Sequence, residues 1–215
     1  GINNDVTIST IVSGGHLFLH QPLHPSYPAL SSLQHRMNQW YTRTSAPELP
    51  NIIDNAICAV CVQNNWYRVQ IVSHDAPTKT CQVKYLDFGG FLSTSASELR
   101  QIHADFMTVP FQAIECVMSN IRPPNGGEWS KEAADTIQNF TQGVILQAQI
   151  AGYTEDCLPE VYLFVSITKD EVENFDSSSV TDFDDFLILF QNVLFINQEL
   201  CARKLAEWIP NEQEG

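Results

Sequence analysis

The chain has 215 residues, 44% of them hydrophobic, which is enough for one sizeable domain or two closely joined small ones. Its 11 basic and 25 acidic residues give a formal charge of −14, which disfavours non-specific nucleic-acid binding and favours cationic, arginine-rich partners, although solubility alone also explains it. No run reaches the ~18 apolar residues of a membrane span, so we expect a soluble fragment, and the start at Gly1 suggests a piece of a longer protein.

The N-terminal residues predict a β-hairpin followed by a helix. Residues 5–12 alternate as a strand does, a Ser-Gly-Gly turn follows, and residues 16–20 form a second strand. From Ala29 onward, apolar residues recur at helical spacing, which predicts a helix packed by one face against a sheet. These residues are Leu30, Leu33, Met37, Trp40 and Tyr41. Residues 42–50 hold two prolines and small polar side chains, typical of a linker.

The next segment predicts a small, closed, antiparallel barrel, because short strands follow one another with turns between them. The strands are expected at 57–62, 66–73, 81–86 and from Phe91.

Two tyrosines lie on the inner faces of these strands. Tyr67 shares a face with Val69 and Ile71 by strand alternation, and Tyr85 shares a face with Cys81 and Val83. Trp66 and Arg68 fall on the opposite face, where we expect packing for Trp66 and a surface ion pair for Arg68.

The residues after the barrel predict further strands and two helices. Ser130 can cap a helix that has Glu132 in its first turn. A Ser-rich acidic loop is expected at 168–186, and an amphipathic helix from Ile196 to Trp208 ends the chain. The strands are expected at 111–117, 144–150, 160–167 and 190–196.

The sequence W-Y-R at 66–68, followed by Y-L-D-F-G at 85–89, resembles the Tudor domain. A barrel with pieces of a second β domain on both sides resembles the extended Tudor arrangement. The resemblance implies a mainly β, α+β fold, in which an SH3-like Tudor barrel is inserted in an oligonucleotide-binding fold similar to staphylococcal nuclease. The implied ranges are 1–50 and 103–215 for the two parts of the flanking fold and 51–102 for the barrel.

Within this family, G-H-L-F at 15–18, L-R-Q-I at 99–102 and L-A-E-W at 205–208 resemble the mitochondrial outer-membrane A-kinase anchoring proteins. The alternative is the Tudor and KH group of the piRNA pathway, which shares P-F-Q-A-I-E-C at 110–116. The first resemblance implies a non-catalytic scaffold on the cytosolic face of the mitochondrial outer membrane. Other regions of such a scaffold bind the regulatory subunit of protein kinase A and RNA.

The resemblance also implies an aromatic cage for methylated arginine. Carried over residue by residue, the cage positions fall on Cys61, Tyr67, Tyr85, Phe88 and Gly90. Cys61 leaves one wall open, and Gly90 lacks the side-chain amide that would bond the guanidinium. Each aromatic face contributes about 0.5–1 kcal/mol to an exposed cation, and a hydrogen bond to a charged group contributes roughly 1.5–3 kcal/mol.

An incomplete cage therefore predicts weak binding of an arginine-rich or methylarginine peptide, binding of another ligand, or no such binding. The alternative for Tyr67 and Tyr85 is that they fill the barrel core. Asp87 and Gly89 are expected to shape the turn, Asp87 by capping it with its side chain, with a ligand role as the alternative.

No cofactor or metal site is expected. Cys58 and Cys61 have the spacing of zinc ligands, but residues three apart on a strand point to opposite faces, and the histidines match no compact ligand set. The six cysteines look like reduced, small core residues. No catalytic motif occurs, so we expect no enzyme. Direct RNA binding requires exposed aromatic rings beside a basic groove, and no such groove is evident, whereas a scaffold or self-association surface remains an alternative.

Overall fold

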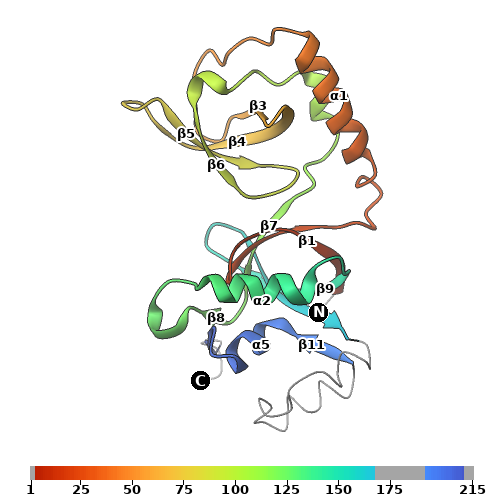
Figure 1. Ribbon diagram of the computed structural model, residues 1–215, viewed down its shortest axis with the longest axis vertical. Coiled ribbons are helices and arrows are strands. Elements are labelled where there is room, and N and C mark those ends of the chain that lie inside the picture. Colours follow the sequence, from red (N-terminus) through yellow and green to blue (C-terminus); the bar gives the residue numbers. More distant parts are fainter. Residues whose placement is uncertain (1–2, 168–191, 211–215) are drawn as a thin grey trace. The chain divides into compact units, whose positions relative to one another are not determined.

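The computed structural model describes residues 3–167 and 192–210 (Figure 1). Contacts divide the chain into two compact units. We call residues 22–114 the barrel unit and residues 1–21 with 115–215 the flanking unit. Strands predominate in the described ranges, together with three α-helices, which confirms the predicted mainly β, α+β fold. The acidic loop predicted at 168–186 lies outside the described residues.

The barrel unit contains a four-stranded antiparallel sheet in the order β3-β4-β5-β6. Its strands are β3 (Ile57–Val62), β4 (Asn65–Asp75), β5 (Thr80–Tyr85) and β6 (Phe91–Ser95). After β6 the chain returns to β3, where Ala59 and Arg100 exchange two backbone hydrogen bonds of 2.9 Å. This pairing closes the curled sheet into the predicted barrel.

Alternate residues of the four strands fill the barrel, as the sequence pattern predicts. Val69 and Ile71 of β4 and Cys81 and Val83 of β5 are all fully buried in one cluster, and Tyr67 and Tyr85 pack against that cluster while staying half-buried. The predicted strand faces are therefore confirmed for both tyrosines.

Helix α1 (Ala29–Arg43) covers the outside of strands β3 and β4 in the barrel unit (Figure 1). Its buried stripe packs on Ala59 and Phe106, and polar bonds fix its position along β4. Gln34 Nε2 donates to the Trp66 carbonyl at 2.5 Å, and the Trp66 amide donates to Asn38 Oδ1 at 2.7 Å. The helix thus groups with the barrel, whereas the sequence ranges placed it in the segment 1–50.

The flanking unit holds a six-stranded sheet in the order β11-β10-β7-β2-β1-β9. Strand β10 also pairs with β9, so five of these strands form a closed ring, and β7 and β10 are its parallel pair. The oligonucleotide-binding-type fold expected for the flanks stays a prediction. The strands are β1 (Asn3–Ser13), β2 (His16–His20), β7 (Ile114–Met118), β9 (Leu146–Tyr153), β10 (Pro159–Ser166) and β11 (Val193–Phe195).

Helix α2 (Lys131–Thr141) begins where the sequence predicts, because Ser130 Oγ accepts the amide of Ala133 at 3.2 Å. Helix α5 (Ile196–Ala202) is attached to β10 by Asn197, whose side chain is fully buried. Asn197 Oδ1 accepts the Leu163 amide at 3.1 Å, and its Nδ2 donates to two backbone carbonyls.

The prediction of one terminal helix through Trp208 is wrong. Helix α5 ends at Ala202, and Lys204 has a φ of 60°, which a right-handed helix does not contain. The chain then forms the short strand β12 (Glu207–Trp208), which pairs with β8 (Ile121–Arg122). The backbone reverses at Lys204 and gives Trp208 a strand partner instead of a helical turn.

Candidate functional site

Three aromatic side chains gather at one end of the barrel. The Tyr67 ring centroid lies 5.3 Å from that of Tyr85 and 5.8 Å from that of Phe88, with interplanar angles of 85° and 87°. All three rings are half-buried. Tyr67 thus stands perpendicular to two other rings, an arrangement that combines aromatic faces and edges at one place. We call Tyr67, Tyr85 and Phe88 the aromatic cluster.

The turn that carries Phe88 depends on two glycines. Gly89 and Gly90 have φ angles of 79° and 85°, a region that side chains with a Cβ rarely adopt. The Tyr85 amide donates to the Gly90 carbonyl at 3.0 Å, and the Gly89 amide donates to the Tyr85 carbonyl at 3.1 Å. These bonds close the turn on Tyr85 and place Phe88 at its tip.

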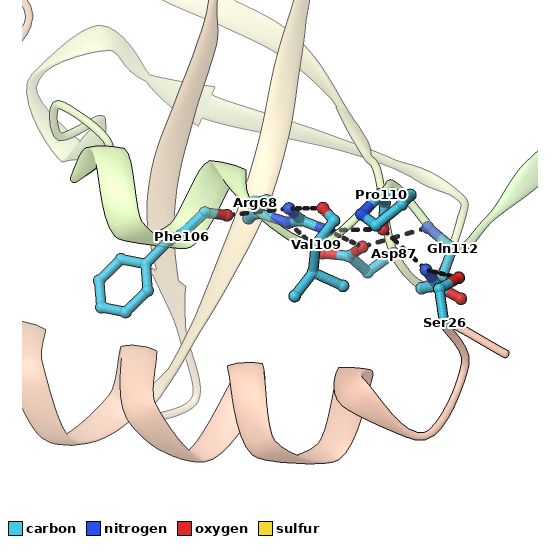
Figure 2. Close-up of polar contacts among 7 residues, drawn as sticks. All are labelled: Ser26, Arg68, Asp87, Phe106, Val109, Pro110 and Gln112. Atoms are coloured by element: carbon cyan, nitrogen blue, oxygen red, sulfur yellow. Dashed lines mark hydrogen bonds and ion pairs between the residues drawn. The ribbon is translucent and has the colours of Figure 1, made fainter.

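Arg68 and Asp87 form a buried, two-pronged ion pair beneath this turn (Figure 2). Arg68 Nε donates to Asp87 Oδ2 at 2.8 Å, and Arg68 Nη2 donates to Asp87 Oδ1 at 2.6 Å. The side chains are 0% and 5% exposed. The predicted surface role of Arg68 is therefore wrong, because the segment after the barrel folds over the guanidinium.

The same guanidinium also holds that covering segment (Figure 2). Its Nη atoms donate to the carbonyls of Phe106 at 2.9 Å, Val109 at 2.6 Å and Pro110 at 3.2 Å. Asp87 Oδ1 also accepts the amide of Gln112 at 3.3 Å. Asp87 thus joins the turn to Arg68 and to the covering segment, and its role as a side-chain cap of the turn stays a prediction.

The pairing of β3 with β4 decides which residue of β3 adjoins the aromatic cluster. Cys61 lies opposite Trp66, and Val60 lies opposite Tyr67. Since paired residues share a sheet face and neighbours alternate, Cys61 is on the face opposite Tyr67. Val62, by contrast, lies on the Tyr67 face and packs against the barrel core. The structure thus brings together three of the five carried-over positions, places Gly90 in the adjoining turn, and does not bring Cys61 to the cluster.

A cavity of about 480 Å³ lies beside Phe88, along the N-terminal half of α1. Tyr27, Leu30, Gln34 and Asn38 are among its lining residues, and no Asp or Glu lines it. No sequence pattern indicates this cavity, because it depends on how α1 packs next to the turn of Phe88.

The Tyr85 phenol suits a cationic guest in its neutral form. Burial raises the pKa of Tyr85 above its ordinary value of 10, and the neighbouring Tyr67 adds to the shift. Tyr85 is therefore an uncharged ring at physiological pH, and it attracts a cation through its π face rather than through a phenolate charge.

Other chemistry finds little support in the described part of the chain. No group of three or more His, Cys, Asp or Glu side chains there is placed to hold a metal ion, and no described helix is long and apolar enough to span a membrane. All six cysteines are free. Cys58, Cys81 and Cys116 are buried as predicted, Cys201 is intermediate, and Cys61 and Cys157 are exposed, so for these last two the core prediction is wrong.

Comparison with protein families decides the classification. The model of the Tudor domain matches residues 1–120, more than half of the chain. The chain belongs to the Tudor family.

The curated relatives of this Tudor chain include two anchoring proteins. It is 31% identical to the mitochondrial A-kinase anchor protein 1 of Mus musculus over 97% of its length, which is 22% of that protein. It is 33% identical to the KH domain-containing protein akap-1 of Caenorhabditis elegans over 80% of its length, which is 20% of that protein. The chain therefore spans about a fifth of the relatives that it matches.

Solved structures show the same extended Tudor fold. The extended Tudor domain TD3 from mouse TDRD1, in complex with a MILI peptide containing dimethylarginine, has a TM-score of 0.75 and 21% identity, with 97% of this chain and 94% of that chain covered. The extended Tudor domain from BmPAPI in complex with sDMA has a TM-score of 0.72 and 21% identity, with 96% and 98% covered. The recognition of an extended Tudor fold from the sequence is thus confirmed.

Proposed function

We propose that this chain is a non-catalytic protein-interaction module that holds one arginine side chain of a partner peptide, symmetrically dimethylated, on the aromatic cluster. The observation that carries the proposal is the placement of Tyr67 perpendicular to both Tyr85 and Phe88 at the barrel end. The two structural neighbours described above are complexes with dimethylarginine ligands, which supports the choice of guest.

The physics of the cluster favours a weak, methyl-dependent interaction. Each suitable ring face contributes about 0.5–1 kcal/mol to an exposed cation, and about 2 kcal/mol or more when water is excluded. Methyl groups replace N–H groups that would otherwise stay bonded to water, so methylation lowers the cost of leaving water. Because Val62 rather than an aromatic ring lies on the Tyr67 face of β3, and Gly90 has no amide side chain, we expect binding well below that of a complete cage.

The cavity beside Phe88 sets the preference for residues next to the modified arginine. Its lining includes Tyr27, Gln34 and Asn38 but no carboxylate, so it offers no partner to a second cation. We therefore expect the cluster to prefer an arginine flanked by small, neutral or apolar residues over one within a dense arginine-rich run.

In the whole protein, we propose that the module serves a scaffold of the A-kinase anchoring type at the cytosolic face of the mitochondrial outer membrane. The similarity to the mouse and nematode anchoring proteins supports this. Binding of the protein kinase A regulatory subunit and of RNA would belong to other regions of such a protein. The incomplete cage favours one alternative, a scaffold or dimerisation module without methylarginine binding, and matches to Tudor and KH proteins keep a piRNA-pathway role as another.

The test replaces one ring of the cluster without opening the core. Tyr85→Leu keeps an apolar side chain against the barrel and removes the π face. We expect at least tenfold weaker binding of a dimethylarginine peptide, from the loss of about 1.4 kcal/mol or more, with a nearly unchanged thermal transition. Tyr153→Leu is the control, because Tyr153 is a 64% exposed ring on β9 of the flanking unit. Equal binding by both variants would refute the role of the cluster.

A gain-of-function pair tests the register. Gly90→Asn together with Val62→Phe should strengthen binding, although Asn at a φ of 85° costs about 1 kcal/mol of stability. Gly90→Asn with Cys61→Phe, the pair suggested by the sequence alone, should give less, because Cys61 lies on the other sheet face. The opposite order would show that position 61 forms the wall.

A further inference from the structure

The six arginines of the chain divide into two groups by their partners. Arg68 pairs with Asp87, Arg122 with Glu207 and Arg203 with Glu199, and Arg100 donates to the carbonyls of Ser97 and Leu99. The side chains of Arg36 and Arg43, by contrast, have no hydrogen bond or ion pair to any residue that the structure describes. In a chain with 25 acidic residues, two unpaired arginines on one helix are unexpected.

Both arginines line one cavity of about 350 Å³ on α1, in the barrel unit. They are seven residues apart, so they lie on one side of the helix and about 10 Å apart along its axis. Trp40 of α1 and His103 of the segment that follows the barrel line the same cavity. The cavity thus combines two cations with aromatic rings.

The Trp40 ring is held in place by neighbouring rings. Its centroid lies 4.7 Å from Tyr41 at an angle of 82°, 5.0 Å from His103 and 5.9 Å from Phe106. Trp40 is nevertheless only half-buried. A ring that is fixed at its edges and open to a cavity loses little freedom when a planar ligand stacks on it.

The local charge differs in sign from that of the whole chain. No Asp or Glu occurs from Pro22 to Pro47, which includes all of α1. The acidic group that lines the cavity is Asp105, 3.7 Å from Nδ1 of His103 and 77% exposed. Since charges separated by more than about 8 Å are largely screened at physiological salt, the two arginines set the local attraction despite the net charge of −14.

We propose that Trp40, Arg36 and Arg43 form a binding site for single-stranded nucleic acid, separate from the aromatic cluster. A base stacks on Trp40, and the two guanidinium groups contact phosphates on either side. About 10 Å along the helix equals about three steps of a stacked strand at about 3.4 Å each. The combination of stacking rings with flanking cations is what sequence-tolerant single-strand binding uses. A phosphopeptide would use the arginines but would not need to stack on the indole.

The test is fluorescence anisotropy with labelled eight-nucleotide RNA, A8 and U8, at 50 and 150 mM salt. Arg36→Gln with Arg43→Gln should weaken binding about tenfold or more and reduce the salt slope by about 1.4, since each phosphate contact on a single strand contributes about 0.7. The charge-matched control is Lys79→Gln with Lys204→Gln, which removes two positive charges elsewhere and should leave the affinity within about twofold.

Two further variants test the stacking ring and the local charge. Trp40→Phe should weaken binding severalfold and abolish the quenching of tryptophan fluorescence by the RNA, and Asp105→Asn should tighten binding. Each variant must retain its thermal transition. The proposal is overturned if RNA does not bind, if both double variants weaken it equally, or if a phosphoserine peptide binds in an Arg36- and Arg43-dependent way while the RNA does not.

Discussion

Replacing Arg68 should destabilise the barrel unit far more than replacing an exposed arginine. Arg68→Met keeps much of the apolar stem but removes five hydrogen bonds, two to Asp87 and three to backbone carbonyls. It leaves the Asp87 carboxylate, 5% exposed, without its counter-ion. Breaking one side of a buried pair costs about 3–5 kcal/mol, a large part of the roughly 5–15 kcal/mol that stabilises a typical domain.

The assay is urea unfolding followed by circular dichroism, with Arg122→Met as the matched control. Arg122 also binds a carboxylate, that of Glu207 at 3.0 Å, but the two side chains are 57% and 37% exposed. An exposed pair contributes about 0–1 kcal/mol. We therefore expect a large shift of the unfolding midpoint for Arg68→Met and almost none for Arg122→Met.

A double variant separates the ion pair from the rest of the network. Arg68→Met with Asp87→Leu removes both charges, so it should be less destabilising than the sum of the two single variants by about 2 kcal/mol or more. The carbonyls of Phe106 and Val109 still lack the Arg68 donor, whereas that of Pro110 keeps Gln112 Nε2 at 2.8 Å, so the double variant should not regain full stability. Similar losses for Arg68→Met and Arg122→Met, or additive single variants, would refute the reasoning.

Three more outcomes follow from burial and titration. Iodoacetamide at neutral pH should modify the exposed Cys61 and Cys157 within minutes, and mass spectra should show the buried Cys58, Cys81 and Cys116 unreacted until urea is added. Early labelling of a buried thiol would contradict the packing of the core around it. Burial raises the pKa of Cys58 and Cys116 from 9.0 to about 12. The contribution of these thiols to the free energy of unfolding should therefore be constant below pH 9 and fall between pH 9 and 12, because only the unfolded thiols ionise there. A urea midpoint that stays constant up to pH 12 would contradict this. Asn197→Leu should cost about 2–4 kcal/mol in urea unfolding, because the buried Leu163 amide and Ser119 carbonyl lose their Asn197 partner, while the Val161 carbonyl keeps the Ser119 amide. A neutral change would contradict this.

Strand faces and helix stripes could be predicted from the sequence, because they follow from local periodicity. Tyr67 and Tyr85 lie on the buried faces as expected, and the buried residues of α1 include Leu33, Met37 and Tyr41. The cap of α2 by Ser130 could likewise be predicted. Each of these features is decided by residues within a few positions of one another.

The partners of Arg68 could not be predicted, because they come from far along the chain. Strand alternation correctly placed Arg68 on the sheet face that does not carry Tyr67. An outward-facing arginine on a short strand is ordinarily exposed. Its burial depends on the backbone of Phe106, Val109 and Pro110, about 40 residues later. Loop placement of this kind leaves no periodic signal.

The sheet face of Cys61 depends on a turn, which strand periodicity alone does not describe. The turn between β3 and β4 has only two residues, Gln63 and Asn64, with φ angles of 48° and 64°. This turn pairs Cys61 with Trp66 and leaves Val62 on the face of Tyr67. Because a shift of one residue changes the face of every side chain, the face of Cys61 follows only from the turn geometry, and its role in the cage, taken from the resemblance, stays a prediction.

The most direct test of the proposed function is a calorimetric titration of this chain with two peptides that differ only in the central arginine. One carries symmetric dimethylarginine and the other unmodified arginine, each flanked by small neutral residues, at low and at physiological salt. The account predicts weak binding with a clear preference for the methylated peptide, and a preference that persists at physiological salt because π faces rather than surface carboxylates supply it. Equal affinity for the two peptides, or no binding of either, would contradict it.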